Sequence, residues 1–197
     1  LEALLREGAD VDAAQADGAT ALHWAAYRND VDSVRRLVEA GADATVVSRD
    51  GATPLSLASV SGNAEIIELL LRAGADPNER SRNGETPLMM AARTGNVAAL
   101  EVLLGHGAEV DATESLRGTT ALMWAAAYEN PAAVRVLVEH GADVSLRSSA
   151  IPRGRRPYLA PSARSRIEDF ERGVGQAGRA IDVDLDGADD TGFSDAD

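Results

Sequence analysis

Two histidines at equivalent positions of the sequence, His106 and His140, are the first candidates for metal binding. Each precedes a Gly-Ala pair, and the two are 34 residues apart. Neutral imidazole is a common zinc ligand, although a zinc site needs three or four protein ligands. Each histidine also falls at the expected end of a helix, where an imidazole interacts favourably with the helix dipole. We favour this structural role and expect no metal at the pair.

A run of alternating acidic residues near the end of the chain could bind calcium. Asp182, Asp184 and Asp186 supply oxygen ligands at the first, third and fifth positions of a calcium loop, and Gly187 supplies the following glycine. The last position of such a loop requires a bidentate Glu, and here it is Phe193. We therefore favour a solvated acidic segment, with calcium binding left open as the alternative.

No combination of residues in the sequence matches a catalytic motif. The chain has no Cys, and all 19 of its basic residues are Arg, which excludes thiol nucleophiles, lysine Schiff bases and P-loops. The patterns Gly-x-Ser-x-Gly and His-Glu-x-x-His are absent, and no Gly-x-Gly-x-x-Gly lies between an expected strand and an expected helix. We predict a protein that is not an enzyme, with no cofactor and no small-molecule substrate.

Internal repeats determine where all these residues lie. Similar segments start at Gly18, Gly51 and Gly84, at a spacing of 33 residues, and a fourth starts at Gly118 after 34. A second block, Gly-Ala-Asp or Gly-Ala-Glu, recurs in the same phase at Gly8, Gly41, Gly74, Gly107 and Gly141. Two blocks that keep one period indicate stacked repeat units.

Each repeat carries the signals of two short helices. A threonine stands at the N-cap position of the first helix, and Pro54 and Pro87 follow at the first helical position. The four threonines are Thr20, Thr53, Thr86 and Thr120. The second helix is expected to start after Asp30, Asn63, Asn96 or Asn130, each of a favoured N-cap type. The glycines of the Gly-Ala-Asp block are expected to end it in a left-handed conformation.

These motifs resemble ankyrin repeats. The block Thr86-Pro-Leu-Met-Met-Ala-Ala92, the Leu-Leu pair of the second helix and the Gly-Ala-Asp ending carry the resemblance. It covers residues 1–148 and implies an all-α solenoid of stacked helix-turn-helix units with hairpin-like loops. We expect a half repeat at 1–15 and full repeats at 16–48, 49–81, 82–114 and 115–148.

The repeats depart from the family pattern in three places. The family's histidine, which ties neighbouring turns together, is present only as His23, and its equivalents are Ser56, Met89 and Met123. We expect looser turns there. Asn29 and Glu129 stand where the family favours Gly, and we expect both to be left-handed. One extra residue within 113–117 predicts a longer loop in the fourth repeat.

The resemblance also implies where a partner binds, because ankyrin-like proteins usually bind partners on the concave face formed by the loops and the first helices. Tyr and Arg are enriched in interface hot spots, so the candidate contacts on these loops and first helices are mainly Tyr and Arg residues. The predicted partner-binding residues are Tyr27, Arg28, Arg49, Arg82, Glu85, Arg93, Arg117 and Tyr128. A column at one repeat phase is assigned to the core and not to the contacts: Trp24, Leu57, Met90 and Trp124.

The two ends of the chain are expected to differ from the array. Residues 149–175 keep the repeat phase weakly, and we predict a degenerate fifth repeat or a capping segment. Residues 176–197, which are rich in Gly and Asp, predict a disordered acidic tail. The chain begins with Leu inside an expected helix, so we expect a fragment or a processed form of a longer protein. Heavy use of Ala, Gly, Asp and Arg without Lys predicts a GC-rich, bacterial coding sequence.

Charge narrows the class of partner. The net charge of −13 and the pI of about 4.6 disfavour binding to nucleic acid or to an anionic membrane. We therefore predict a monomeric, non-enzymatic scaffold that binds another protein. Two alternatives stay open: nucleic-acid contact through the Arg-rich segment 147–166, and a regulatory or targeting role within a larger enzyme or effector. No signal peptide or membrane-spanning run is visible, so a cytoplasmic location is favoured, with a lost signal peptide left open.

Overall fold

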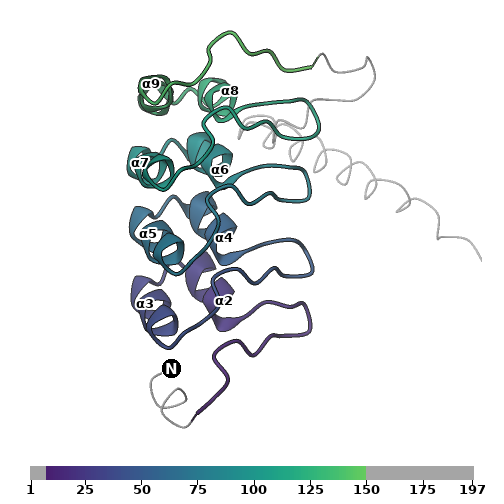
Figure 1. Ribbon diagram of the computed structural model, residues 1–197, viewed down its shortest axis with the longest axis vertical. Helices are drawn as coiled ribbons and strands as arrows, with labels where there is room; N and C mark the ends of the chain where they lie inside the picture. Colours follow the sequence, from purple (N-terminus) through teal and green to yellow (C-terminus); the bar gives the residue numbers. More distant parts are fainter. Residues whose placement is uncertain (1–7, 150–197) are drawn as a thin grey trace, which may run out of the picture. The chain divides into compact units, whose positions relative to one another are not determined.

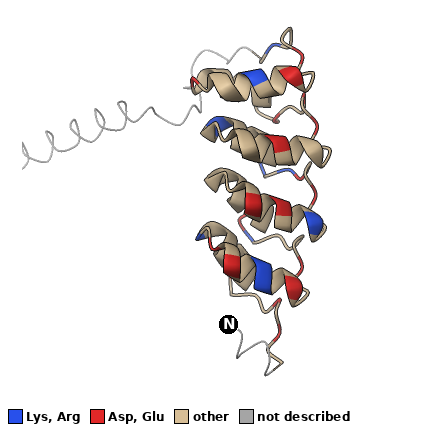
Figure 2. Cartoon of the chain, turned by 90° about the vertical axis from the view of Figure 1, so that its left-hand side faces the viewer, with Lys and Arg blue, Asp and Glu red and all other residues tan. Residues whose placement is uncertain are grey.

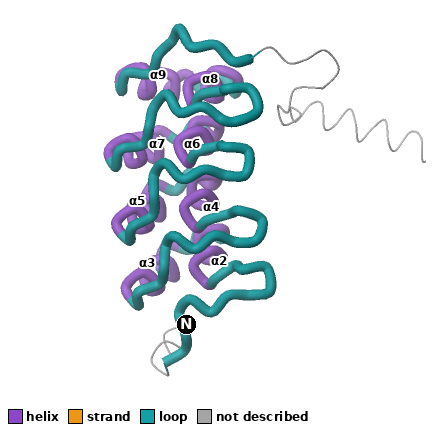
Figure 3. Tube along the Cα trace, turned by 45° about the vertical axis from the view of Figure 1, so that its right-hand side comes forward, coloured by secondary structure: helices purple, strands orange, loops and turns teal. Residues whose placement is uncertain are grey.

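A computed structural model describes residues 8–149, and this part of the chain is helical without strands (Figure 3). Its helices are α2 (Ala21–Tyr27), α3 (Val31–Glu39), α4 (Pro54–Ser61), α5 (Ala64–Arg72), α6 (Pro87–Thr94), α7 (Val97–Gly105), α8 (Ala121–Ala127) and α9 (Pro131–Glu139). The predicted fifth repeat or cap, the acidic tail and the calcium loop lie outside the described residues.

The helices stack as pairs in two layers (Figure 1). An inner layer contains α2, α4, α6 and α8, an outer layer contains α3, α5, α7 and α9, and each helix packs against the next one in its layer. The loops that precede α2, α4, α6 and α8 project beside the inner layer. We call their tips finger 1 (15–19), finger 2 (48–52), finger 3 (81–85) and finger 4 (114–119). This arrangement confirms the all-α solenoid expected from the sequence.

Finger 4 is longer than the other fingers, as predicted. In finger 1 the Gly18 amide bonds to the Gln15 carbonyl, three residues earlier, at 2.9 Å, and fingers 2 and 3 close in the same way. In finger 4 the Gly118 amide reaches back four residues to the Glu114 carbonyl at 3.1 Å. The extra residue is therefore contained in the turn, and the helices on both sides keep their places.

The carboxylate of Glu114 organises this longer turn. It accepts hydrogen bonds from the amides of Leu116 at 2.5 Å, Arg117 at 2.8 Å and Thr119 at 3.1 Å. Burial acts to raise the pKa of Glu114, but the bonds from Thr119, Leu116 and Arg117 outweigh it and hold the pKa below its ordinary value. In finger 2 the Ser48 hydroxyl accepts a single such bond. A carboxylate, with two oxygens, can hold the wider loop.

Threonine side chains start the inner helices as predicted. The hydroxyls of Thr53, Thr86 and Thr120 accept bonds from main-chain amides of the first helical turn. Thr20 is also the N-cap of α2, but its amide and hydroxyl lie 3.2 and 3.0 Å from Nδ1 of His23. These bonds satisfy amides that have no partner inside the helix.

Three of the four outer helices start with a side-chain cap, and α9 does not. Asp30, Asn63 and Asn96 accept bonds from the first turns of α3, α5 and α7. The cap predicted for the Asn130 side chain is wrong. Its amide instead donates to the carbonyls of Ala92 at 3.1 Å and Arg93 at 3.0 Å, in the last turn of α6. Those carbonyls lack helical partners, so Asn130 ties one repeat to the next.

The core lies between the two layers and continues from one pair to the next. Its fully buried large side chains are leucines, isoleucines and one methionine, with Val34 in α3: Leu22, Leu37, Leu55, Ile66, Ile67, Leu70, Leu88, Met89, Leu100, Leu103 and Leu137. Small residues are buried at one phase of each inner helix, namely Ala25, Ala58, Ala91 and Ala125. A larger side chain at these positions would separate neighbouring helices.

Two residues take the left-handed conformation between paired helices, as predicted. Asn29 has φ 60° and Glu129 has φ 57°, where the other two pairs have Gly62 and Gly95. Non-glycine residues pay roughly 1 kcal/mol for this conformation. The tight turns between α2 and α3 and between α8 and α9 therefore form without glycine.

Candidate protein-binding face

The residues predicted to bind a partner all lie on the inner helices and the fingers. We call the surface formed by the exposed sides of α2, α4, α6 and α8 together with fingers 1–4 the inner face. Tyr27 and Arg28 lie at the end of α2, Arg93 lies in α6, and Tyr128 is the C-cap of α8. The others lie on fingers 2, 3 and 4: Arg49, Arg82, Glu85 and Arg117.

These residues differ in how freely they can reach a partner. Tyr27 is 65% exposed, and three arginines are also exposed: Arg28, Arg49 and Arg82. The rest are only partly exposed: Glu85, Arg93, Arg117 and Tyr128. Tyr128 packs against the core, and its hydroxyl is enclosed without a hydrogen-bond partner within residues 8–149.

Arg82 connects two fingers. Its guanidinium donates to the main-chain carbonyl of Arg49, and its side chain lies against Gly51. A Cβ at Gly51 would come within 3.1 Å of Arg82 Cγ, so the glycine leaves room for this contact. The side chain of Arg82 therefore contributes to the spacing of fingers 2 and 3 as well as to the surface.

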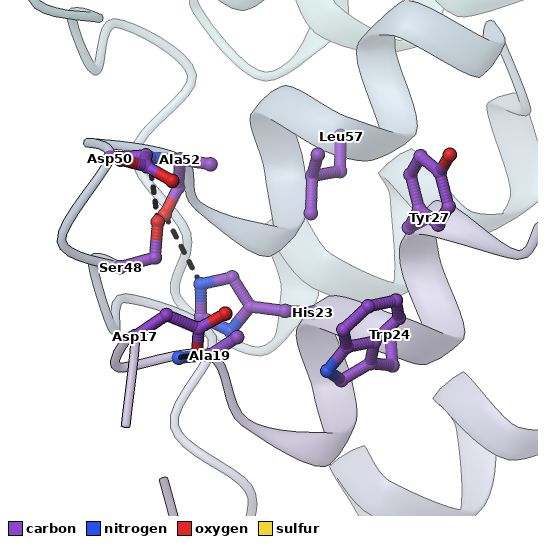
Figure 4. Close-up of a pocket in the computed structure, with 9 residues that line it drawn as sticks. All are labelled: Asp17, Ala19, His23, Trp24, Tyr27, Ser48, Asp50, Ala52 and Leu57. Carbon is purple, nitrogen blue, oxygen red and sulfur yellow. Dashed lines mark hydrogen bonds between the residues drawn. The ribbon is translucent and has the colours of Figure 1, made fainter. Parts of the chain in front are cut away.

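The inner face contains a hollow at its N-terminal half, of about 250 Å³. Figure 4 shows side chains of α2 and α4 on one side and residues of fingers 1 and 2 on the other. The lining residues are Asp17, Ala19, His23, Trp24, Tyr27, Ser48, Asp50, Ala52 and Leu57. Tyr27 is the one predicted contact among these nine.

The assignment of Trp24 to the core is wrong. Trp24 is 43% exposed and lines the hollow, whereas Trp124, at the same repeat phase, is 9% exposed and belongs to the core. Leu22, Ala25 and Ala26 are the core residues of α2. Trp24 lies about 200° around the helix from Leu22, on the opposite side of α2. Trp124 has the same place in α8, but its ring lies beside that of Tyr128, with the centroids 5.8 Å apart. The signal in the sequence was the presence of two aromatic residues, Trp24 and Tyr27, three positions apart on one expected helix.

His23 links α2 to finger 2, as the resemblance implied. Its Nε2 lies 3.1 Å from the Ala52 carbonyl, and its Nδ1 lies 3.2 Å from the Thr20 amide. An amide can only donate and a carbonyl can only accept, which assigns the neutral ring with the proton on Nε2. Burial lowers the pKa of His23 and outweighs the opposing effects of the Ala52 and Val46 carbonyls and of Asp17. The histidine is therefore uncharged at neutral pH.

At the equivalent place in the next repeat, Ser56 bonds to the main chain of Thr53 in its own helical turn. Glu79, which lies just before finger 3, makes the link to the following loop instead. The Thr53 hydroxyl donates to the Glu79 carboxyl group. Burial raises the pKa of Glu79 to about 7. The repeat therefore replaces an uncharged histidine with a carboxyl group that is half protonated near neutral pH.

The outer layer has a different surface, with acidic and basic residues interspersed along it (Figure 2). Arg35 pairs with Glu65 across two helices at 2.6 Å, and Arg72 pairs with Glu68 along α5 at 2.6 Å. Exposed pairs of this kind are typical of a solvated surface.

The two histidines considered for metal binding lie in this layer and have separate partners. His106 Nε2 is 2.9 Å from Glu68, and His140 Nδ1 is 2.8 Å from the Val136 carbonyl of its own helix. No group of three or more potential metal ligands occurs within residues 8–149. Both histidines are helix C-caps, the role favoured from the sequence.

The comparisons with known proteins agree with this architecture. The family model described as "Ankyrin repeats (3 copies)" matches residues 1–81 and 73–148. No curated protein matches the chain. None of the helices described here is long and apolar enough to cross a membrane. Ankyrin repeats are generally protein–protein interaction modules and are typically not enzymes. Because the matched residues span three quarters of its length, the chain belongs to the ankyrin repeat family.

Proposed function

We propose that this protein binds another protein noncovalently through the inner face, which corresponds to the concave face of the ankyrin stack. The exposure of Trp24 and Tyr27 beside the hollow is the observation that carries the proposal. Only 4% of the residues in the chain are aromatic, yet two of them are exposed together on this face. Aromatic side chains are enriched among interface hot spots.

The mechanism is the presentation of side chains on a rigid support. Hydrogen bonds connect successive fingers, from the Arg49 amide to the Asp17 carbonyl at 2.8 Å and from the Ser115 amide to the Asn83 carbonyl at 2.9 Å. These bonds hold the fingers in place before a partner arrives. A surface that is already ordered loses less conformational entropy on binding.

Both signs of charge are present on the inner face. Arg28 and Arg49 are exposed and adjoin the lining residues Tyr27 and Asp50 in the sequence, whereas Asp17 and Asp50 line the hollow itself. We therefore expect a partner with carboxylates opposite the arginines. Charges of this kind, at the rim of an interface, contribute mainly to specificity and association rate.

Photo-crosslinking tests which face binds the partner. A photoreactive phenylalanine is placed at Val60 on the inner face or, as the control, at Val138 on the outer layer, since both valines are exposed. Extracts of the source organism are then irradiated. We expect an adduct from position 60 that disappears when Tyr27→Ala and Arg93→Ala are combined. An adduct from position 138 that resists these changes would place the partner elsewhere.

The two alternatives from the sequence stay predictions. Nucleic-acid contact depends on the Arg-rich segment 147–166, most of which lies outside the described residues. A steep loss of binding with salt would be its signature. A regulatory or targeting role within a larger enzyme or effector is tested by reading the gene on both sides of the stretch that encodes residues 1–197.

A further inference from the structure

One wall of the hollow in the inner face is aromatic and apolar. The rings of Trp24 and Tyr27 are perpendicular, at 89°, with their centroids 6.1 Å apart, and Leu57 of α4 lies beside them (Figure 4). Aromatic rings attract cations through their π faces, and Trp does so best. The same wall can pack against an alkyl chain.

The opposite wall is acidic. Asp17 of finger 1 and Asp50 of finger 2 are both among the nine lining residues, and no Arg is among them. One carboxylate oxygen of Asp17 accepts a bond from the Ala19 amide at 3.0 Å, which fixes this side chain at the rim. The two carboxylates come from different repeats and reach the hollow only because the fingers stack.

His23, also in the lining, does not offset these negative charges. Its Nδ1 faces the Thr20 amide, a group that can only donate, so the ring is uncharged in this arrangement. The hollow therefore combines two carboxylates and an aromatic pair without a positive group of its own.

We propose that this hollow binds the side chain of an Arg or Lys residue from the partner protein. The inference rests on the function proposed above and adds the chemistry of the anchoring residue. The methylene groups of such a side chain would lie along Trp24 and Leu57, while the cationic head would face Asp17 and Asp50. Long cationic side chains bury their stems along apolar surface in this way, while the charged head stays solvated. An anion would meet two carboxylates here and is disfavoured.

The test uses the full chain with Trp124→Phe, which makes Trp24 the single fluorescent Trp. The Nε1 atom of Trp124 has no hydrogen-bond partner in the described part of the chain, so this change removes no bond there. The probe is the peptide acetyl-Gly-Arg-Gly-amide, and its control has citrulline, an uncharged analogue of Arg with nearly the same shape. We expect saturable quenching of Trp24 by the Arg peptide and roughly tenfold weaker binding of the citrulline peptide.

A matched variant tests the two carboxylates. Asp17→Asn with Asp50→Asn removes the charges but keeps an oxygen that can accept the Ala19 amide, and circular dichroism checks the fold. We expect the Arg peptide to bind roughly tenfold more weakly to this variant. Equal binding of the two peptides, or unchanged binding to the double variant, would overturn the proposal.

The segment 147–166 of the same chain is a competing occupant, because it has six Arg and no acidic residue. Changing these arginines to Gln in the full chain should leave Trp24 emission and peptide affinity unchanged. A shift in Trp24 emission together with tighter peptide binding in this variant would show that the segment occupies the hollow. The proposal that the hollow binds a side chain of the partner would then be wrong. If crosslinks from Val60 persist undiminished in the Asp17→Asn, Asp50→Asn variant, the proposed function stands and the proposed basic anchor is wrong.

Discussion

At the scale of single residues, Glu79 makes stability depend on pH near neutrality. Its pKa is about 7 in the folded protein, compared with an ordinary value of 4.5. Between these two values the folded state binds more protons than the unfolded state, so the free energy of unfolding falls as pH rises. This decrease in the free energy of unfolding is complete once the pH is well above the pKa of Glu79 in the folded protein.

Replacing Glu79 with Gln should remove this dependence. Because Gln stays neutral, the Glu79→Gln variant should be more stable than the parent by about 1–3 kcal/mol at pH 8, with little difference at pH 5. Urea unfolding at both pH values measures this. Glu101→Gln, on the exposed side of α7, makes the same change of charge as a control. An advantage that is the same at pH 5 and pH 8 would contradict the prediction.

Asn130 and Asn96 have the same position in the repeat but opposite roles. Asn96 accepts a bond from the Ala99 amide at 3.1 Å, whereas Asn130 donates to two carbonyls of the preceding repeat. Changing Asn130 to Asp should cost about 1–3 kcal/mol, because the donor is lost and a negative charge faces those carbonyls. Asn96→Asp keeps the cap and should change stability by less than about 0.5 kcal/mol. Thermal unfolding of both variants measures these changes in stability. Equal losses of stability would contradict the prediction that Asn130 and Asn96 have different roles.

At the scale of elements, finger 4 depends on a single carboxylate. Glu114→Gln should destabilise the protein by about 1–3 kcal/mol at pH 7, because three main-chain amides share that acceptor group. Since the folded pKa lies below 4.5, the stabilisation is present above pH 4.5 and is lost as the pH falls through the folded pKa. The difference in the free energy of unfolding between the Glu114→Gln variant and the parent should therefore become smaller at low pH. Urea titrations at pH 7 and pH 3.5 measure it, with Glu139→Gln on the exposed end of α9 as the control.

The helices could be predicted from the sequence because their signals are local. The Thr caps, Pro54 and Pro87 and the Gly-Ala-Asp endings each act within a few residues, and the repeat places them in phase. The hollow could not be predicted in the same way. Asp17 and Asp50 are far apart in the sequence, and they line the same hollow as Trp24 only because fingers 1 and 2 stack beside α2. Repeat phase also failed to predict the burial of Trp24 and Trp124, because residues at the same position of two repeats can have different neighbours.

At the scale of the whole described array, each helix pair depends on its neighbours alone. Helix α9 packs on α7 and α8, and α8 packs on α6, so the last pair is supported from one side by the described residues. In such linear arrays stability is nearly a sum of repeat and interface contributions. A defect in one pair should therefore affect adjacent pairs most.

Leu100→Ala, in the fully buried core of α7, tests this dependence. It should cost about 2–5 kcal/mol. In single-Trp variants, Trp124 should then report unfolding at lower urea than Trp24, because α8 adjoins the damaged pair and α2 does not. Without Leu100→Ala the two probes should give closer midpoints. Coincident midpoints in the altered protein would show that the array unfolds as one unit.

The extra residue held by Glu114 in finger 4 also bears on how such proteins diversify. The insertion changes the turn but leaves the packing of α6 against α8 in place. Insertions and deletions can therefore accumulate at finger tips without a matching change in the core. Since the fingers form part of the proposed recognition surface, a lineage could acquire a new ligand by lengthening one loop while inheriting an intact scaffold.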